Sequence, residues 1–330
     1  MVQLQHFRIA GTGIYLPSGI VSAEQVDARM DAPVGWTASR SQVLTRYECL
    51  PPESVATMAG KACRAALQDA GRSIAEIDLI IDCSTSLYQP IPCNAAVYQS
   101  ELGAEATGIP CVDVHGTCLG FVLALNMVNG LFATGAYQRV LLITSEAALA
   151  GVNWKEWESA SLMSDGAAAV IVEAIEAKES FVYRHQTFSE YREACEVRSG
   201  GHRQGPFEYS PEREADFRFS MNGAALFRVA RQKLPGMVTE VFEATTVPRG
   251  EVHIVPHQAS PFAVESIRRI IDHPESLYYN RVARMGNMVA ASIPVVLHQV
   301  IQEGKVKRGD TLMLLGTSAG YAQAACTFRY

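Results

Sequence analysis

The stretch VDVHGTCLGFVLALNMVNG, residues 112–130, decides the fold because a β-branched segment runs through small residues directly into an apolar helix. The residue at the turn is Cys118. If the helix begins at or just after Cys118, its unpaired N–H groups and positive dipole end lie beside the sulfur and favour the thiolate. Gly116 and Gly120 are expected to let a substrate approach the backbone. A cysteine before an apolar helix is more often a small core residue, so this signal is weak by itself.

Segments on either side of this stretch show the same alternation of strand and helix. Residues 77–86 and 139–146 have the composition of buried strands, and residues 54–71 have a helical pattern. The alternation predicts an α/β fold.

The second half of the chain repeats this plan in residues 251–260, 286–304 and 310–320. We therefore predict two related halves, residues 1–176 with the cysteine and residues 177–330, joined by a polar, irregular connection over residues 177–217.

Aligning the halves pairs residues that carry chemistry. Cys83 falls opposite His257 and Cys118 opposite Asn287, with offsets that differ by five residues. A histidine after an apolar strand is commonly structural, and an Asn before an apolar helix is commonly its N-cap. Their joint placement with Cys118 nevertheless favours a site where three polar groups converge.

Composition narrows the class of protein. The 330 residues are 48% hydrophobic with a formal net charge of −6 and no basic block, so neither nucleic acid nor an anionic membrane is an expected partner. The N-terminus lacks a secretory pattern and no apolar run is long enough to span a membrane, which predicts a cytoplasmic protein. Eight scattered cysteines without a CxxC pair predict no disulfide framework and no metal site.

Several motifs together resemble one family. They are GTGIYLP (11–17), GTCLGF (116–121), SDGAAAVIV (164–172), VPHQAS (255–260), GNMVAASIP (286–294) and GTSAGYA (316–322). Over nearly the whole chain the sequence is similar to β-ketoacyl-acyl-carrier-protein synthase III, a condensing enzyme of the thiolase superfamily. The resemblance implies a five-layered αβαβα fold and an acyltransferase that acts in fatty-acid, polyketide or secondary-metabolite synthesis.

Carried onto matching positions, the resemblance implies that Cys118 accepts an acyl group from an acyl-CoA or acyl-carrier-protein thioester. His257 and Asn287 would hold the carbonyl of a malonyl thioester, whose decarboxylation gives the attacking enolate. Backbone N–H groups of Cys118 and Ala319 would form the oxyanion hole. No metal or organic cofactor is expected. A thiolase is disfavoured because the C-terminal loop holds Ser318 in place of a second cysteine, and Cys326 is expected to pack in a final strand.

The family also suggests substrate-binding positions. Trp36 and Arg40 resemble residues around the CoA nucleotide. Trp157 stands near where the housekeeping enzymes have an arginine, which implies altered CoA binding or delivery by a carrier protein, and Ser260 replaces the usual Asn after HQA. Ile91 stands where a residue of one subunit closes the acyl pocket of its partner, which implies a homodimer. A Phe is common there, so Ile91 suggests a longer or branched acyl chain.

Two other functions stay open at this point. An acyltransferase on the same fold could deliver the acyl group to an oxygen or nitrogen nucleophile without decarboxylation. A non-catalytic partner subunit could keep the fold and only bind acyl carriers. The motif departures, including Met288 and Val289 after GN, favour a specialised pathway over routine chain initiation.

Overall fold

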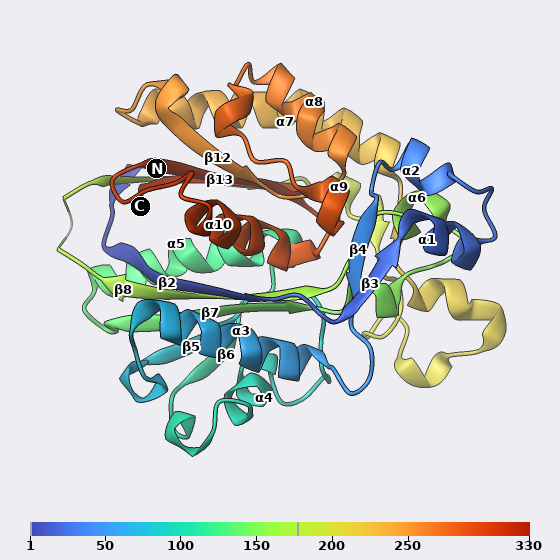
Figure 1. The fold of residues 1–330 in the computed structure, drawn as a ribbon, viewed down its shortest axis with the longest axis horizontal. Coiled ribbons are helices and arrows are strands. Elements are labelled where there is room, and N and C mark those ends of the chain that lie inside the picture. The colour runs from blue at the N-terminus through green and yellow to red at the C-terminus, as the bar shows by residue number, and fades with distance from the viewer. Residues whose placement is uncertain (1, 177) are drawn as a thin grey trace.

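Two five-stranded sheets face each other across a central layer of helices (Figure 1). The structure, a computed structural model, describes residues 2–176 and 178–330. The first sheet has the order β2 (Phe7–Tyr15), β8 (Gly166–Ala174), β7 (Arg139–Glu146), β5 (Leu79–Asp82) and β6 (Cys111–Asp113). The second has the order β1 (Val2–Leu4), β9 (Ser180–Thr187), β14 (Ala322–Arg329), β13 (Thr311–Ser318) and β12 (Val252–Pro256).

The two sheets repeat one pairing pattern. In the first sheet, β5 and β7 are parallel, whereas β7 pairs antiparallel with β8 and β8 with β2. In the second sheet, β12 and β13 are parallel, whereas β13 pairs antiparallel with β14 and β14 with β9. The predicted boundary after Glu176 falls between β8 and β9, where the chain passes to the second sheet, and the division into two halves stays a prediction.

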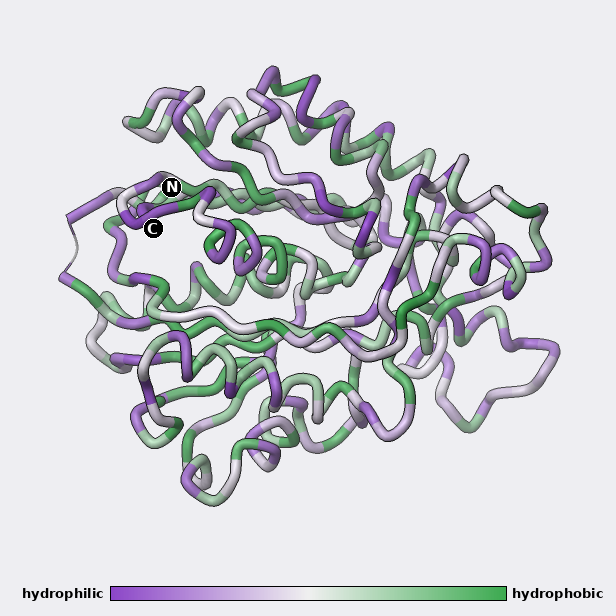
Figure 2. Tube along the Cα trace, in the orientation of Figure 1, coloured by the Kyte–Doolittle hydropathy of each residue, from purple (hydrophilic) through white to green (hydrophobic). Residues whose placement is uncertain are grey.

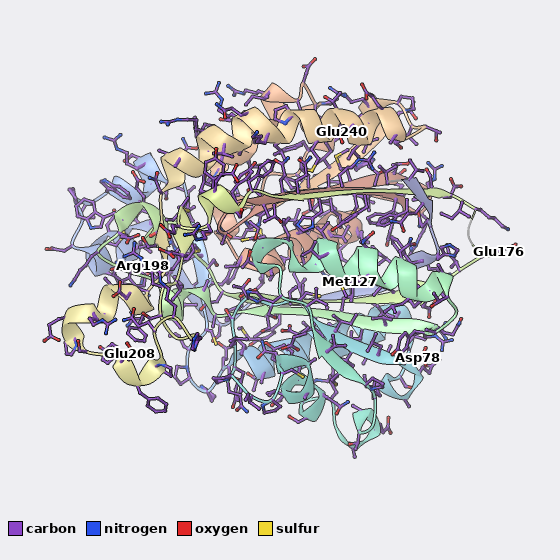
Figure 3. All side chains as sticks on the ribbon, turned by 180° about the vertical axis from the view of Figure 1, so that it is seen from behind. Asp78, Met127, Glu176, Arg198, Glu208 and Glu240 are labelled. Atoms are coloured by element: carbon purple, nitrogen blue, oxygen red, sulfur yellow. The ribbon has the colours of Figure 1, made fainter. Side chains whose placement is uncertain are left out.

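Helices complete five layers. The central layer is α5 (Gly120–Ala133) and α10 (Ser292–Gln302); the outer layers are α3 (Val55–Ala70) with α4 (Asn94–Ser100), and α7 (Gly223–Ala244) with α8 (Pro261–Ile270). One core joins α5 and α10 to both sheets, and separate cores lie under each outer layer. In Figure 3, Met127 marks α5 in the centre and Glu240 marks α7 in an outer layer. The expected αβαβα arrangement is confirmed.

The position of α5 explains its sequence. A helix with sheets on both sides has little surface left for water, so most of its circumference must be apolar. Eight of its residues are buried, and they lie on several sides of the helix: Gly120, Phe121, Val122, Ala124, Leu125, Val128, Asn129 and Phe132. Figure 2 shows hydrophobic segments along the strands and central helices, with hydrophilic segments mainly at the periphery.

Smaller elements gather at one end of the sheets, to the right in Figure 1. They are α1 (Ala23–Met30), α2 (Trp36–Arg40), α6 (Trp157–Ala160), α9 (Val282–Met285), the hairpin pair β3 (Gly19–Ser22) with β4 (Thr45–Glu48), and the pair β10 (Cys195–Glu196) with β11 (Ser220–Met221). An irregular lobe that includes Arg198 and Glu208 projects from this end (Figure 3).

One sequence expectation about these segments is wrong. Residues 177–217 were predicted to be irregular, yet β9 occupies Ser180–Thr187 and pairs with both β1 and β14. Its sequence, SFVYRHQT, buries only Phe181 and Val182 fully, so it lacks a clear apolar alternation. The strand is specified by neighbours from both ends of the chain. Among the described residues, no helix is long and apolar enough to cross a membrane.

Candidate active site

The turn that carries Cys118 is tight and strained. A 3-10 turn over Thr117–Leu119 leads into α5, and Thr117 has φ of +45°, in the left-handed region that residues with a Cβ rarely adopt. Cys118 is therefore held in a fixed position just before the first turn of α5. The sequence prediction that a helix begins at or just after Cys118 is confirmed.

The glycines that flank this turn are required by packing. A Cβ on Gly120 would lie 2.2 Å from the carbonyl oxygen of Cys83, and a Cβ on Gly116 would lie 2.2 Å from Cδ1 of Leu123. The expectation that both glycines let a substrate approach the backbone stays a prediction. Gly120 lets α5 approach the end of β5, and Gly116 makes room for a side chain of α5.

The thiol itself is neutral in the resting protein. Burial raises the pKa of Cys118 to about 12, and the nearby Cys195 and Glu146 add to the effect. Hydrogen bonds from the backbone N–H groups of Ala319 and of Cys118 itself lower the pKa, but they do not outweigh burial. The expectation that the helix end favours the thiolate is wrong for the unliganded site, because loss of hydration exceeds the stabilisation by the helix dipole.

The C-terminal loop between β13 and β14 is fastened to the cysteine turn. Ser318 Oγ donates to the carbonyl oxygen of Gly116 at 3.0 Å, and the N–H of Ala319 faces the sulfur of Cys118. Two backbone donors, those of Cys118 and Ala319, thus converge on one sulfur atom. Cys326, further along, is fully buried in β14, as predicted.

His257 follows directly after β12. Its N–H donates to the carbonyl oxygen of Leu315 at 2.7 Å, which extends the β12 and β13 pairing by one residue. Burial lowers the pKa of the imidazole to about 4, so the ring is neutral at pH 7. Its Nδ1 is buried and has no hydrogen-bond partner in the described part of the chain, and the residue lines a cavity.

Asn287 presents its amide in a defined orientation. Oδ1 accepts from the N–H of Val289 at 2.9 Å, which assigns the other side-chain atom as the Nδ2 donor. Nδ2 makes a long contact of 3.4 Å with the carbonyl oxygen of Ala259, in the turn after His257. An amide carries two hydrogens on this nitrogen, so one remains for another acceptor.

The cysteine turn and the end of β12 meet at Gly316 of β13. A Cβ there would lie 3.0 Å from Cδ2 of Leu119 and 3.1 Å from Cβ of His257. Leu119 adjoins Cys118, so this glycine brings the cysteine turn and the histidine close together. His257, Asn287 and Gly316 itself line one cavity of about 620 Å³.

Most of the predicted substrate-binding residues surround that cavity. Trp36, Arg40 and Ser260 line it, and Arg40 is exposed at its rim. Trp157 packs edge-on against Trp36, with ring centroids 5.5 Å apart and planes at 75°. Ile91 lies elsewhere, on a loop where its side chain is 84% exposed.

Sequence reasoning missed the apolar wall of the cavity. Gly223, Phe227, Ala230 and Leu234 lie along one face of α7, and Phe262 of α8 touches Phe227 with ring centroids 5.4 Å apart. The spacing of three or four residues along α7 was a signal, but the same pattern is typical of ordinary core packing.

The chain is similar in sequence to proteins of one known family. A family model described as 3-Oxoacyl-[acyl-carrier-protein (ACP)] synthase III matches residues 112–189, and its C-terminal counterpart matches residues 243–330. A β-ketoacyl-[acyl-carrier-protein] synthase III of Neisseria meningitidis is 30% identical over 99% of this chain and 100% of its own.

Solved structures are similar over the whole chain. The 3-oxoacyl-[acyl-carrier-protein] synthase III of Aquifex aeolicus VF5 has a TM-score of 0.86 at 28% identity, covering 98% of this chain and 100% of its own. The priming β-ketosynthase of the R1128 polyketide pathway shares the fold, with a TM-score of 0.89 at 22% identity, covering 99% of this chain and 97% of its own.

Proposed function

The chain belongs to the 3-oxoacyl-[acyl-carrier-protein] synthase III family, and from this we propose that Cys118 is acylated by a thioester and then condensed with a malonyl thioester. The protein is a condensing acyltransferase of fatty-acid or polyketide synthesis. One observation carries the assignment of residues: His257, Asn287 and Gly316 line one cavity, and a Cβ on Gly316 would lie 3.0 Å from Cδ2 of Leu119, which adjoins Cys118.

In the first step the Cys118 sulfur attacks the carbonyl carbon of the acyl thioester. The carbon–sulfur bond to the donor breaks, and the departing thiol takes the proton that Cys118 gives up. Negative charge develops on the carbonyl oxygen, where the backbone N–H groups of Cys118 and Ala319 can stabilise it. Because these donors are fixed by the turn and the C-terminal loop, they need no reorganisation during the reaction.

In the second step a malonyl thioester loses CO2, and the electron pair of the broken carbon–carbon bond forms an enolate. Asn287 Nδ2 and the neutral His257 ring donate to the enolate oxygen. The enolate carbon then attacks the acyl carbonyl and forms a carbon–carbon bond. The carbon–sulfur bond to Cys118 breaks, and the departing thiolate takes a proton from water to regenerate the thiol. A neutral histidine suits this step because it stabilises the oxygen without delivering a full proton early. Neither step requires a metal or an organic cofactor.

Thioesters of CoA or of an acyl carrier protein would enter beside Arg40. Trp36 and Arg40 offer an aromatic face and a guanidinium for the carrier end of the substrate, and Ser260 lines the passage. Phe227 and Phe262 form an apolar opposite wall.

We also propose a homodimer whose acyl pocket is completed by Ile91 of the partner copy. Strand β6 pairs only with β5 among the described strands, so one edge of the strand that leads to Cys118 is unpaired. Leu87, Tyr88 and Ile91 are exposed on one loop, with Ile91 84% exposed, which suits burial in an interface. Light scattering coupled to gel filtration tests the dimer.

We also propose a longer or branched acyl group as the primer. If acetyl-CoA proves the fastest primer in a chain-length series, this assignment is wrong.

A condensation assay tests the reaction. Acyl-CoA donors of graded length are incubated with malonyl-CoA or malonyl-acyl-carrier protein, and both released CO2 and the β-ketoacyl product are measured. We expect stoichiometric CO2 and product, both lost in Cys118→Ala. Acyl transfer to an oxygen or nitrogen acceptor without CO2 would indicate the rival acyltransferase, and no acyl-enzyme with any donor would indicate a carrier-binding subunit.

A further inference from the structure

Arg46 of β4 is among the largest side chains in the protein that are fully shielded from water. It is 0% exposed, and its Nη1 donates to the carbonyl oxygens of Ala160 at 3.1 Å and Met163 at 3.4 Å. Its Nε and Nη2 have no hydrogen-bond partner among the described residues. Burial lowers the pKa of the guanidinium to about 10, so it is still charged at pH 7. Among the described residues this cation is hydrogen-bonded only to neutral carbonyls, although the charge of Asp27 favours its charged form, and so costly an arrangement calls for a functional reason.

The turn that Arg46 binds is also hydrogen-bonded to Asn287. The N–H of Asn287 donates to the carbonyl oxygen of Leu162 at 2.8 Å, and the N–H of Ser164 donates to the carbonyl oxygen of Asn287 at 3.0 Å. Arg46 donates hydrogen bonds to the carbonyl oxygens of Ala160 and Met163. The residues of the turn that bind Arg46 thus alternate along the chain with those that bind Asn287. Movement of this turn would therefore move the backbone of Asn287 with it.

Leu44, directly before β4, and Thr45, its first residue, hold the chain that leads into Asn287, where β4 runs beside α9 (Figure 1). The N–H of Leu44 donates to the carbonyl oxygen of Ala283 at 2.7 Å, and Thr45 Oγ1 donates to that of Arg284 at 2.9 Å. Gly286, next to Asn287, has φ of +67°, and a Cβ there would lie 2.7 Å from Cβ of Ser164. The chain that leads into Asn287 is thus held in place, and there is no room for a side chain at Gly286.

We propose that Arg46 is a positioning residue for the condensation step: it fixes the turn of residues 160–163, and through that turn it aims the Asn287 amide into the cavity. The inference rests on the proposed function, because it assigns Asn287 to the second step. It predicts that changes at Arg46 act on the condensation and leave the acylation of Cys118 nearly unaffected. The cysteine turn is held by other elements, namely the end of β5 and the loop at Ser318.

The test separates the two half-reactions in Arg46→Lys and Arg46→Gln. Acylation is followed by rapid-quench mass measurement with an acyl-CoA, and condensation by adding malonyl-CoA to the preformed acyl-enzyme. We expect acylation within about twofold of the wild type. Condensation should slow by about 10-fold in Arg46→Lys, which keeps the charge and one carbonyl bond, and by about 100-fold in Arg46→Gln, the scale of a misplaced catalytic group.

Two further variants keep the result interpretable. Leu67→Ala truncates a buried side chain of α3, in an outer helical layer, and lowers the stability of the protein. It serves as the control for destabilisation, and its condensation rate should stay within about twofold of the wild type. Ser164→Ala removes the acceptor of the 2.9 Å bond from the Tyr47 N–H, a second tie between β4 and the turn, and should slow condensation selectively even if the Arg46 variants do not fold.

The outcomes distinguish the inference from the function on which it rests. Suppose that the wild type condenses normally. If the Arg46 variants then slow both steps equally, or slow neither step, the positioning role is wrong. Where the Arg46 variants are unfolded, the same criterion applies to Ser164→Ala. If the wild type forms an acyl-enzyme that malonyl-CoA cannot discharge, the proposed function itself is wrong.

Discussion

Cys118 shows how the surroundings of a single residue decide its reactivity. Burial raises the pKa of its thiol to about 12, so at neutral pH the thiolate is a minor species. Below that pKa the thiolate fraction rises about tenfold per pH unit. We expect the rate of Cys118 alkylation by iodoacetamide to rise steeply from pH 6 to pH 9, as followed by peptide mapping. A plateau near pH 7 would show a preformed thiolate and contradict this view of the resting site.

His257 and Asn287 should affect a different step. Replacing either by Ala removes one donor from the enolate oxygen, and loss of an oxyanion donor slows a reaction by about 100-fold or more. We expect condensation to slow by that amount, with acyl-enzyme formation largely intact, as measured by single-turnover kinetics of each half-reaction. If either variant cannot be acylated at all, the residue acts in the first step and the assignment fails.

At the scale of elements, the position of α5 depends on one close approach. A Cβ at Gly120 would lie 2.2 Å from the Cys83 carbonyl oxygen, whereas a Cβ at Gly130 of the same helix meets nothing within 4 Å. Gly120→Ala should lower the free energy of unfolding by about 1–3 kcal/mol or more and slow acylation. Gly130→Ala should be neutral or stabilising by up to about 1 kcal/mol. Urea unfolding of both variants measures the difference, and equal effects would contradict the packing account.

The sequence predicts elements well where the pattern is local. The helix expected over 54–71 is α3, capped at Ser54 and ended by Gly71, and the strand expected over 139–146 is β7. It fails for β9, whose pairing partners come from both chain ends, and for the cavity wall on α7, which has the pattern of a core helix.

The same division applies to the site. Cys118, His257 and Asn287 each lie at a turn where a strand or helix ends or begins, so their placement could be predicted from the repeat and the motifs. The role of Arg46 could not, because its partners, Ala160 and Met163, are distant in sequence and contribute only backbone carbonyls. The high pKa of Cys118 was also missed, because it depends on burial by both halves.

At the scale of the whole molecule, buried carboxyls set the pH dependence of stability. Burial raises the pKa of Asp82, Glu146 and Asp165 to about 7, above their unfolded values near 4. The folded state therefore holds extra protons between those values, and the stability that these groups contribute is lost as pH rises through the folded pKa.

Buried histidines oppose this effect, because the pKa of His257 is lowered in the folded state, whereas histidines of the unfolded state are about half protonated near pH 6.5. Comparison with Asp82→Asn cancels the histidine contribution and isolates one carboxyl. We expect the free energy of unfolding of the wild type in urea to fall relative to that of Asp82→Asn between about pH 5 and pH 7, by up to about 1.4 kcal/mol per pH unit. A difference that stays constant or rises over this range would contradict the elevated pKa of Asp82.

The central claim, that two halves combine to run acylation and condensation at one cavity, has a direct test. Intact-protein mass spectrometry is performed after incubation with a panel of acyl-CoAs and again after a malonyl-thioester chase, with Cys118→Ala as the control. The account predicts a mass gain equal to the acyl group, absent from the variant and discharged by the malonyl thioester. An acyl group that stays on the protein after the chase, or that is attached equally in Cys118→Ala, would contradict it.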